Sequence, residues 1–361
     1  MRHDRAMEGV IEPVVLVSAS SIRLDIDEQS QIGAARRCAV TLGHTHALSP
    51  DAVGRLAIVV TEAATNIVRH AGFGVIVLRA MLAGQTAGIE VLALDKGPGI
   101  PDVERAMRDG YSTIGTSGRG LGGIQRLAEV FGIYSQRGTG TALLARIGER
   151  PRSSSHARPV ASLDDRVGVV CVPLRGELEC GDAWRIIAGR GRISVLLVDG
   201  LGHGPEAAIA ASAATTEFSR LAHGSPDAAL VALDAALRET RGAALSVAVM
   251  DEVEGTTRFS GVGNVDGRIL AGGATQHLVP QSGIVGHGMP KPRSTDASWP
   301  AGGRLVLHSD GILARWRPES YPGLTTAHPA LLAGVIYRDF ARDRDDATVF
   351  VLGDRAAEGR L

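Results

Sequence analysis

Apolar positions in the first part of the chain follow two periodicities, one helical and one strand-like. Apolar residues recur at helical spacing over 29–43 and 51–70, and the second segment follows the capping pair Ser49-Pro50 and stops at Gly72. Strand-like runs cover 14–25, 73–82, 89–94, 133–136 and 141–147, and the last four read as two hairpins. The pattern predicts helices packed on one face of a mixed sheet.

The pattern changes after residue 148. Residues 149–162 lose apolar periodicity and gather Pro, Ser and Arg, which is typical of a linker. Beyond the linker, helical spacing is found over 205–223, 226–240 and 329–342. Short strand-like runs occupy 167–174, 192–198, 243–250, 256–262, 267–271, 303–308 and 347–352. This part is predicted to be a β-sandwich flanked by helices.

Composition narrows the function classes. The chain has 361 residues, which is enough for two domains with real cores, and 44% hydrophobic with 21% charged residues is typical of a soluble globular protein. A net charge of −1 gives no electrostatic footprint for nucleic acid or acidic membranes, and no apolar run reaches spanning length. We therefore expect a cytoplasmic protein with neither partner. Three cysteines without paired spacings indicate neither a disulfide framework nor a zinc site.

Two glycine clusters border a candidate nucleotide pocket. Asp95 ends the apolar run 91–94 and is followed by Gly97 and Gly99, so a carboxylate that can accept an adenine amino group lies beside open backbone. The second cluster precedes a helical run that starts at Ile124, where free N–H groups favour phosphate. Its members are Gly118, Gly120, Gly122 and Gly123. Either cluster alone is equally consistent with an ordinary turn.

The helix predicted over 51–70 carries Glu62 and Asn66 four residues apart, hence on one face. This spacing suits a general base beside a magnesium ligand, and it also suits a solvated edge of the helix.

Three segments resemble the nucleotide-binding boxes of the GHKL ATPase fold: TEAATNIVRHAG, DKGPGIPD and GTSGRGLGG. DGYST between the glycine boxes resembles the RsbT-type serine kinases. The resemblance covers about residues 13–148. It implies that Glu62 activates a protein hydroxyl, that Asn66 holds Mg²⁺ between the phosphates of ATP, and that Asp95 binds adenine. It also implies that the pocket and its lid are shaped by Gly97, Gly99, Gly118, Gly120, Leu121 and Gly122.

Four aspartates in the second half stand where strands end and turns begin: Asp182, Asp199, Asp310 and Asp345. Each alone is more typical of a turn residue, since Asp-Gly is a common turn pair. Together they would converge at one sheet edge, and clustered carboxylates repel unless hard cations neutralise them. Two Mg²⁺ or Mn²⁺ ions held in this way can support attack on a phosphate.

The segments CGD, DGLGHG, GNV, SDG and DDAT resemble the SpoIIE-like branch of the PPM-type protein phosphatases, and DGLGHG is most similar to the compact RsbX-like enzymes. The resemblance covers about residues 164–353. It implies that the four aspartates are metal ligands and that the Gly200 carbonyl completes the shell. Asp346 and Asp343 remain alternatives to Asp345 as the fourth ligand.

Two residues beside these motifs have open roles. His203 in DGLGHG either lies near the reactive water or simply begins a helix. Asn264 in GVGNVDG is expected to be a structural turn residue.

The predicted fold class is α+β with two domains. A GHKL (Bergerat) α/β sandwich is expected over 13–148, a linker over 149–162 and a PPM-type α-β-β-α sandwich over 163–354, with tails at 1–12 and 355–361.

The function that follows is a signalling switch. The first domain would phosphorylate a Ser or Thr of a STAS-domain anti-sigma-factor antagonist, the partner that the resemblance implies, and the second would remove that phosphate. Because both activities together would waste ATP, one is expected to run at a time. In the alternative, the first domain only binds ATP or a partner and regulates the phosphatase. A histidine kinase is disfavoured, since no phosphoacceptor helix pair precedes the ATPase domain and His70 is expected to be structural.

Overall fold

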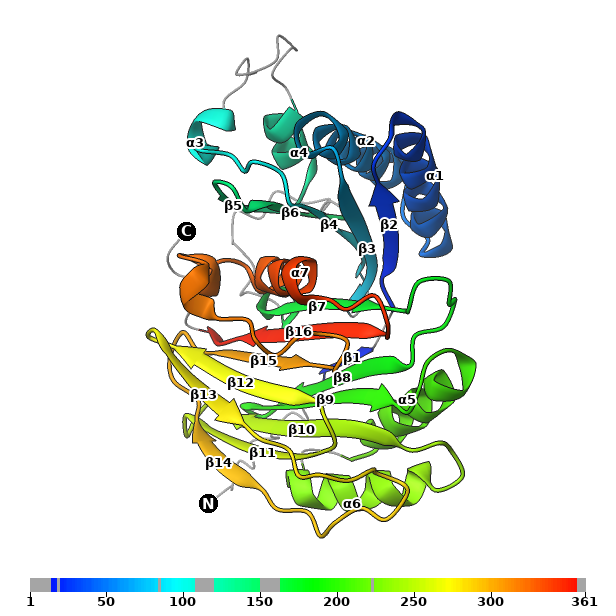
Figure 1. Cartoon of the computed structure of the whole chain (residues 1–361), viewed down its shortest axis with the longest axis vertical. Coiled ribbons are helices and arrows are strands. Elements are labelled where there is room, and N and C mark those ends of the chain that lie inside the picture. Colours follow the sequence, from blue (N-terminus) through cyan, green and yellow to red (C-terminus); the bar gives the residue numbers. More distant parts are fainter. Residues whose placement is uncertain are drawn as a thin grey trace, which may run out of the picture.

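The structure is a computed structural model that describes residues 14–17, 20–83, 86–107, 120–149, 163–221 and 224–355. Its strands form three sheets, and helices lie between and outside them in a stack of six layers, α-β-α-β-β-α (Figure 1). The predicted class, α+β with two domains, is confirmed.

The first sheet consists of five strands. Their order is β2 (Ile22–Ile26), β3 (Gly74–Ala83), β4 (Thr86–Asp95), β6 (Gly140–Gly148) and β5 (Val130–Gln136). Both predicted hairpins are confirmed, because β3 pairs with β4 and β5 with β6. The prediction of a mixed sheet was wrong. The two hairpins lie side by side through β4 and β6, and every pairing in this sheet is antiparallel.

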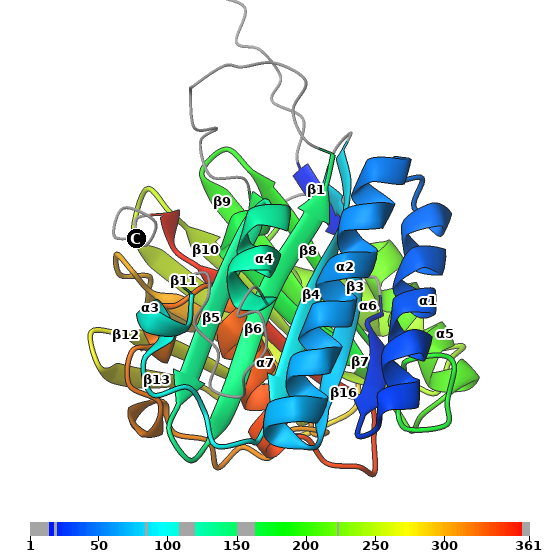
Figure 2. The same ribbon diagram turned by 90° about the horizontal axis from the view of Figure 1, so that it is seen from above.

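Three helices cover one face of this sheet (Figure 2). They are α1 (Gln29–Thr45), α2 (Pro50–Asn66) and α4 (Gly120–Leu127), and a short α3 (Val103–Ala106) lies after β4. Ser49 caps α2 by accepting a hydrogen bond from the Ala52 N–H, as its position before Pro50 predicts. Beyond Asn66 the backbone continues as a π-helix, Ile67–Ala71, and stops at Gly72, whose φ of 76° suits glycine.

The second domain is a sandwich of two antiparallel sheets. The larger has the order β1 (Val14–Val17), β8 (Asp182–Gly189), β9 (Arg192–Gly200), β10 (Ala243–Asp251), β11 (Thr256–Val262), β14 (Thr295–Ser298). The smaller has the order β13 (Ala274–Leu278), β12 (Asp266–Ala271), β15 (Arg304–His308), β16 (Ala347–Gly353), β7 (Val167–Val172). All seven predicted strands are present. Three strands were missed: β8, β13 and β14. β13 and β14 are exposed edge strands with little apolar signal, whereas β8 is a mostly buried inner strand.

Helices cover both outer faces of the sandwich, as predicted. α5 (Pro205–Phe218) and α6 (Pro226–Leu237) pack on the larger sheet, and α7 (Pro329–Phe340) packs on the smaller. These helices end two to five residues before the predicted ends. Short 3₁₀ turns occupy Leu163–Arg166, Pro318–Ser320 and Leu324–Thr326.

The strand predicted over 14–25 is two strands in two different sheets. β2 joins the first sheet beside β3, whereas β1 pairs with β8 in the sandwich. Leu16 lies in the core of the sandwich and Ile26 in the core of the first domain. The pattern over 14–25 reads as one strand-like segment, so its division between two cores was visible only in three dimensions.

α7 joins the two domains through one apolar core. Its residues are buried on all sides, which fits a helix that is apolar all round. Leu331 and Val335 belong to a cluster that includes Leu92 and Leu94 of the first sheet and Val349 of the sandwich. The face of the first sheet that α1 and α2 leave open is therefore covered by a helix of the second domain (Figure 1).

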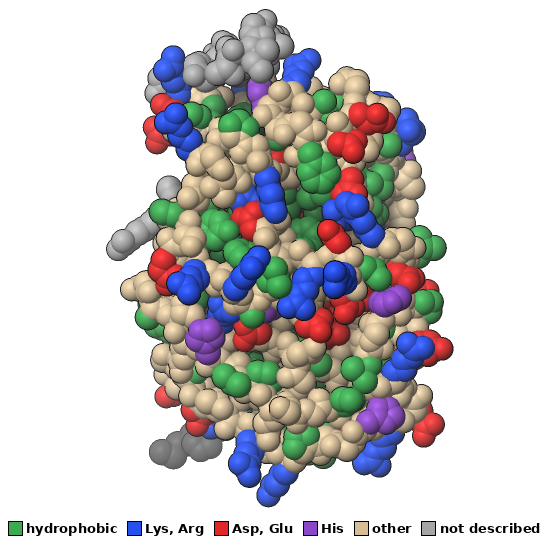
Figure 3. Space-filling view, viewed as in Figure 1, with side chains coloured by type: hydrophobic (Ala, Val, Ile, Leu, Met, Phe, Trp, Pro, Cys, Tyr) green, Lys and Arg blue, Asp and Glu red, His purple; other side chains and the backbone are tan. Residues whose placement is uncertain are grey.

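Several predicted segments lie outside the described residues. These are almost the whole linker (150–162), residues 1–13 and residues 356–361. None of the described helices is both long and apolar enough to cross a lipid bilayer. On the face seen in Figure 3, acidic and basic side chains are interspersed and neither sign dominates.

Candidate functional site

The N-terminus of α4 lies against the polar face of α2. A Cβ added to Gly120 would lie 3.5 Å from Glu62 Oε2 and 3.5 Å from Asn66 Oδ1, which places the second glycine cluster directly beside both side chains. Leu121 packs against the domain core, and Gly122 is buried. The helix start and the two polar side chains therefore face one another. Gly118 and the DGYST segment lie outside the described residues.

Asp95 stands at the end of β4 with one oxygen already engaged. Its Oδ1 accepts hydrogen bonds from the backbone N–H of Gly97, at 2.8 Å, and of Thr141, at 3.2 Å. Burial raises the pKa of Asp95, and these two N–H groups oppose that shift. Thr141 lies opposite Asp95 across β4 and β6, so only the strand register reveals its role.

Gly97 and Gly99 keep the loop after β4 close to its neighbours. A Cβ on Gly97 would lie 2.7 Å from the Cβ of Ala71, at the end of the π-helix. Gly99 has a φ of 72°, and a Cβ there would lie 2.3 Å from the Gln136 carbonyl oxygen. Substitution at either glycine would push the loop away from Asp95.

The second domain contacts the end of β4 through two residues of α7. Arg338 Nη1 donates a hydrogen bond to the Asp95 carbonyl oxygen at 3.1 Å, and Lys96 Nζ lies 3.9 Å from Asp339 Oδ1. Sequence reasoning missed Arg338, because it lies 243 residues from Asp95 and belongs to no recognisable motif.

Two of the four predicted metal ligands are cross-strand neighbours. Asp182 at the start of β8 pairs directly with Asp199 near the end of β9. Asp310 follows β15 and Asp345 precedes β16. The pKa of Asp199 is raised to about 9, first by burial and then by the charges of the other three aspartates. The fold thus brings all four within electrostatic range of one another.

One oxygen of the Asp199 carboxylate has no hydrogen-bond partner among the described residues, whereas the backbone N–H of Asp310 donates to the carboxylate. The oxygen without a partner is the buried Oδ2, and burial also raises the pKa of Asp182 well above its usual range. A buried carboxylate oxygen without a partner is costly, and a hard divalent cation is the partner that oxygen ligands suit. In the part of the chain that the structure describes, no three such side chains already surround a single point. The residues fit divalent cations in kind and location, and the geometry fixes no ion position.

Two neighbouring side chains orient these carboxylates. Ser309 Oγ donates to Asp182 Oδ2 at 2.6 Å, and Asn264 Nδ2 donates to Asp310 Oδ2 at 2.7 Å. Asn264, expected to serve only as a turn residue, therefore also holds a candidate ligand. Ser309 directly precedes Asp310, and its position in SDG was the one signal that pointed to it.

The alternatives to Asp345 have other partners. Asp346 accepts backbone hydrogen bonds from Leu174 at 2.7 Å and Gly181 at 2.8 Å, one at each carboxylate oxygen. Asp343 is exposed and lies 3.7 Å from Arg23 Nη1. Asp345 instead contributes to the raised pKa of Asp199 and of Asp310. Asp346 thus holds the β7–β8 connection, and Asp345 remains the predicted fourth ligand.

Gly200 and His203 lie between β9 and α5. A Cβ on Gly200 would lie 2.4 Å from the Ala207 carbonyl oxygen, so glycine lets α5 approach the strand end. His203 Nδ1 lies 3.0 Å from Glu177 Oε1, and its side chain is half exposed just before α5 begins.

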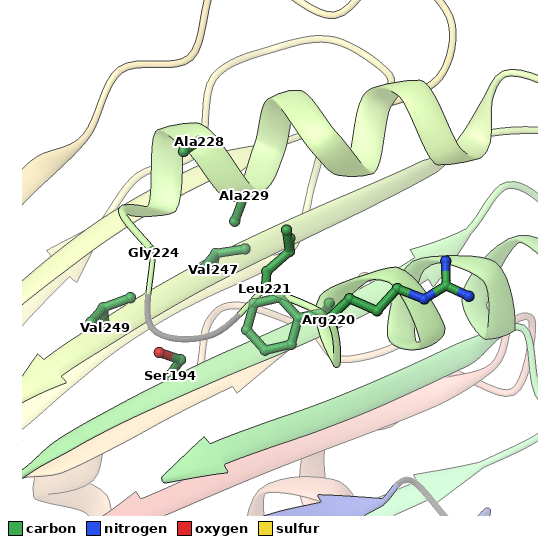
Figure 4. Close-up of a pocket in the computed structure, with 9 residues that line it drawn as sticks. Ser194, Arg220, Leu221, Gly224, Ala228, Ala229, Val247 and Val249 are labelled. Atoms are coloured by element: carbon green, nitrogen blue, oxygen red, sulfur yellow. The ribbon is translucent and has the colours of Figure 1, made fainter. Parts of the chain in front are cut away.

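A cavity of about 300 Å³ lies apart from both candidate sites (Figure 4). It opens between the ends of α5 and α6 and the larger sheet. Its lining is mostly apolar: Ser194, Phe218, Arg220, Leu221, Gly224, Ala228, Ala229, Val247 and Val249. None of the predicted site residues lines it.

Comparisons with known proteins match the two halves separately. Residues 27–147 match the histidine kinase-like ATPase domain family, and residues 189–353 match the stage II sporulation protein E (SpoIIE) family. The serine/threonine-protein kinase RsbT of Bacillus subtilis (strain 168) is 40% identical over 91 residues, which are 25% of this chain and 68% of that protein.

Two solved structures are similar to about half of the chain. A chain from a study of the bacterial stressosome has a TM-score of 0.49 and 29% identity, covering 52% of this chain and 97% of its own. RsbX in complex with magnesium has a TM-score of 0.47 and 19% identity, covering 51% and 92%. The sequence matches carry the assignment. The chain belongs to the family of the serine/threonine-protein kinase RsbT, and it joins that kinase-like ATPase domain to a SpoIIE phosphatase domain.

Proposed function

We propose that this protein is a cytoplasmic switch enzyme with two opposed activities. The first domain transfers the γ-phosphoryl group of ATP to a Ser or Thr of a STAS-domain anti-sigma-factor antagonist. The second removes phosphate from the same partner or a related one. The observation that carries the proposal is the presence in one chain of two polar side chains, Glu62 and Asn66, beside the glycine-rich start of α4 at Gly120, and of a separate cluster of carboxylates around Asp199.

In the kinase direction, each pocket residue has one task. Glu62 accepts the proton of the partner's hydroxyl through its carboxylate, which makes the oxygen a better nucleophile. Asn66 holds Mg²⁺ beside the ATP phosphates, and Asp95 accepts the adenine amino group. The N-terminus of α4, from Gly120 to Gly122, offers free N–H groups to the phosphates.

In the phosphatase direction, two Mn²⁺ or Mg²⁺ ions would be held by Asp182, Asp199, Asp310 and Asp345 together with the Gly200 carbonyl. When bound, such ions stabilise negative charge on the phosphoryl oxygens. Ser309 fixes the Asp182 carboxylate and Asn264 fixes that of Asp310, so two ligand positions are set before any ion binds. The protein thereby reduces the cost of assembling four like charges.

A direct experiment tests both directions with one partner. The purified protein is given Mg²⁺-ATP with an unphosphorylated STAS protein, or Mn²⁺ with the phosphorylated form, and phosphate on the partner is followed by mass spectrometry. Glu62→Gln should stop phosphorylation and spare dephosphorylation, and Asp199→Ala should do the reverse. Glu104→Gln and Asp296→Ala, two exposed positions, are the matched controls.

The contact of Arg338 with Asp95 supports a second candidate, in which the first domain regulates the phosphatase without transferring phosphate. If no STAS partner accepts phosphate from ATP while the Asp199-dependent phosphatase is active, this second function replaces the first. Partner phosphorylation that disappears in Glu62→Gln excludes it.

A further inference from the structure

Two cysteines lie side by side next to the candidate metal cluster. Cys171 is buried in β7 and Cys180 is half buried in the β7–β8 connection, and their Sγ atoms are 3.8 Å apart. A disulfide bond has an S–S distance of about 2.0 Å, so the two sulfurs need to approach by about 1.8 Å. The third cysteine, Cys38, lies in α1 of the other domain.

We propose that Cys171 and Cys180 form a reversible disulfide when the protein meets a hydroperoxide, and that this modification site controls the metal cluster. Hydrogen peroxide first converts the Cys180 thiol to a sulfenic acid and leaves as water. The Cys171 sulfur then attacks the Cys180 sulfur, a second water leaves, and the S–S bond forms. Two thiols and one peroxide thus give one disulfide and two waters.

The order of the two steps follows from exposure. Cys180 is partly accessible, whereas Cys171 is fully buried and can act only on a neighbour that is already oxidised. Cys171 is well placed for that role, because it lies near the end of β7 with its sulfur 3.8 Å from that of Cys180.

The pair is linked to the cluster by short, rigid connections. Cys180 is followed by Gly181, whose N–H donates to Asp346, and then by Asp182. Cys171 Sγ also lies 3.6 Å from the Asp182 carbonyl oxygen. A Cβ on Gly181 would lie 2.6 Å from the Cβ of Ala207, so this segment has no room to move alone. Drawing Cys180 inward therefore shifts Asp182 relative to Asp199.

The connection between the two cysteines, residues 173–180, can adjust its backbone when the disulfide forms. Residues 173–180 contain little regular structure, and Leu178 is 96% exposed. Bond formation is thus expected to disturb the Gly181–Asp182 segment and to leave β7 in place. The expected effect on phosphatase activity rests on the proposed function; formation of the disulfide does not.

The test begins with the reduced full-length protein and hydrogen peroxide. After oxidation the protein is denatured, alkylated with N-ethylmaleimide and digested for mass spectrometry. We expect a linked peptide pair containing Cys171 and Cys180, lighter by two hydrogens and released by dithiothreitol, with Cys38 alkylated. Alkylation of both cysteines after oxidation, or Cys180 recovered as an unlinked sulfinic acid, would overturn the proposal.

Function is measured on the same samples. Oxidation should lower both the Mn²⁺ affinity, measured by calorimetry, and the phosphatase rate by at least about tenfold. This is the size of effect expected when the support of a metal ligand is lost. Dithiothreitol should restore both. Cys180→Ser should resist oxidation and Cys38→Ser should respond like the wild type. A linked protein that binds Mn²⁺ unchanged overturns the control of the cluster, whereas a reduced protein without phosphatase activity counts against the proposed function alone.

Discussion

Two carboxylates, Glu90 in the first domain and Asp199 in the second, are shielded from solvent but have pKa values shifted in opposite directions. Glu90 in β4 is 1% exposed and receives hydrogen bonds from Arg79 and Arg146, its neighbours on the two adjacent strands. Burial alone would raise its pKa, but the two arginines overcome that effect and lower the pKa to about 2. Asp199 is half buried, with its Oδ2 fully enclosed; its nearest charges are other aspartates, and its pKa is raised to about 9.

The difference distinguishes a charge with a structural role, Glu90, from a charge that can bind a ligand, Asp199. Glu90 is satisfied within the protein, and Arg146 extends the network by donating to the Asp164 and Val167 carbonyl oxygens at the start of the second domain. Asp199 keeps an oxygen without a donor. A buried carboxylate that the chain itself does not neutralise indicates a binding function.

The strongest test of the comparison is Asp199→Asn. Losing a ligand should lower the phosphatase rate by about 10³-fold or more, since metal stabilisation of the transition state amounts to several kcal/mol. The rate is measured on a phosphorylated STAS partner with Mn²⁺, and Asp296→Asn serves as the control. Activity within tenfold of the wild type would remove Asp199 from the metal site.

The same variant has a thermodynamic signature. The raised pKa of Asp199 means that the metal-free folded state binds a proton that the unfolded state has lost, so this residue's contribution to stability falls as pH rises from about 4 to about 9. Asp199→Asn should remove that fall. Saturating Mn²⁺ should stabilise the wild type, by about 2.7 kcal/mol at 100 times Kd, and leave the variant unchanged in thermal unfolding.

The matching change in the first domain, Glu90→Gln, should have the opposite effect on stability, because it should lower the free energy of unfolding at pH 7. The substitution removes the buried carboxylate that Arg79 and Arg146 share, and among the described residues only Arg146 keeps a second acid, Asp165 at 3.3 Å. Breaking such a buried ion pair costs about 3–5 kcal/mol of unfolding free energy. Since the pKa of Glu90 is lowered, its contribution is present above pH 4.5 and is lost as pH falls toward about 2. Urea unfolding across this range checks the loss, with Glu254→Gln as the exposed control. Equal stability of variant and wild type at pH 7 would contradict it.

Asn264→Ala should produce a smaller change. The variant removes the donor that orients Asp310, and losing such support lowers metal affinity or activity by about 10- to 100-fold. Titrating the phosphatase rate with Mn²⁺ distinguishes a loss of metal affinity from a loss of activity at saturating metal. Gln276→Ala, on an exposed edge strand, is the control. A variant with unchanged Mn²⁺ dependence and rate would return Asn264 to a purely structural role.

The smallest effect is expected at the contact between the domains. Arg338→Met keeps the aliphatic packing of α7 but removes the hydrogen bond to Asp95, which should weaken nucleotide binding by about 2- to 10-fold. Calorimetry with ADP measures the change against Arg220→Met, an exposed arginine of the second domain. Unaltered affinity would show that α7 supports the pocket without influencing it.

Local sequence predicted much of the fold because capping, glycine stops and apolar periodicity act over short distances. Ser49 and Gly72 marked the two ends of the helical segment formed by α2 and the π-helix that follows it. Asp95, Asp199 and Asp310 were recognisable as acids at strand ends. Thr141 and Arg338 were not, because each meets its partner through strand register or domain packing and has no distinctive neighbours in sequence. Asn264 was noticed in GNV, but its hydrogen bond to Asp310 depends on the tertiary structure.

By itself the sequence determined that two domains form. One has glycine clusters beside a polar helix face, and the other has acids at its strand ends. Both signals depend on residues a few positions apart, so they can be read from short segments. The tertiary structure alone decided that Val14–Val17 joins the second domain, that α7 lies in a core shared by both, and which buried acid is neutralised by arginines. These outcomes depend on contacts between residues up to hundreds of positions apart, and the free energy of such contacts is not encoded in any short segment.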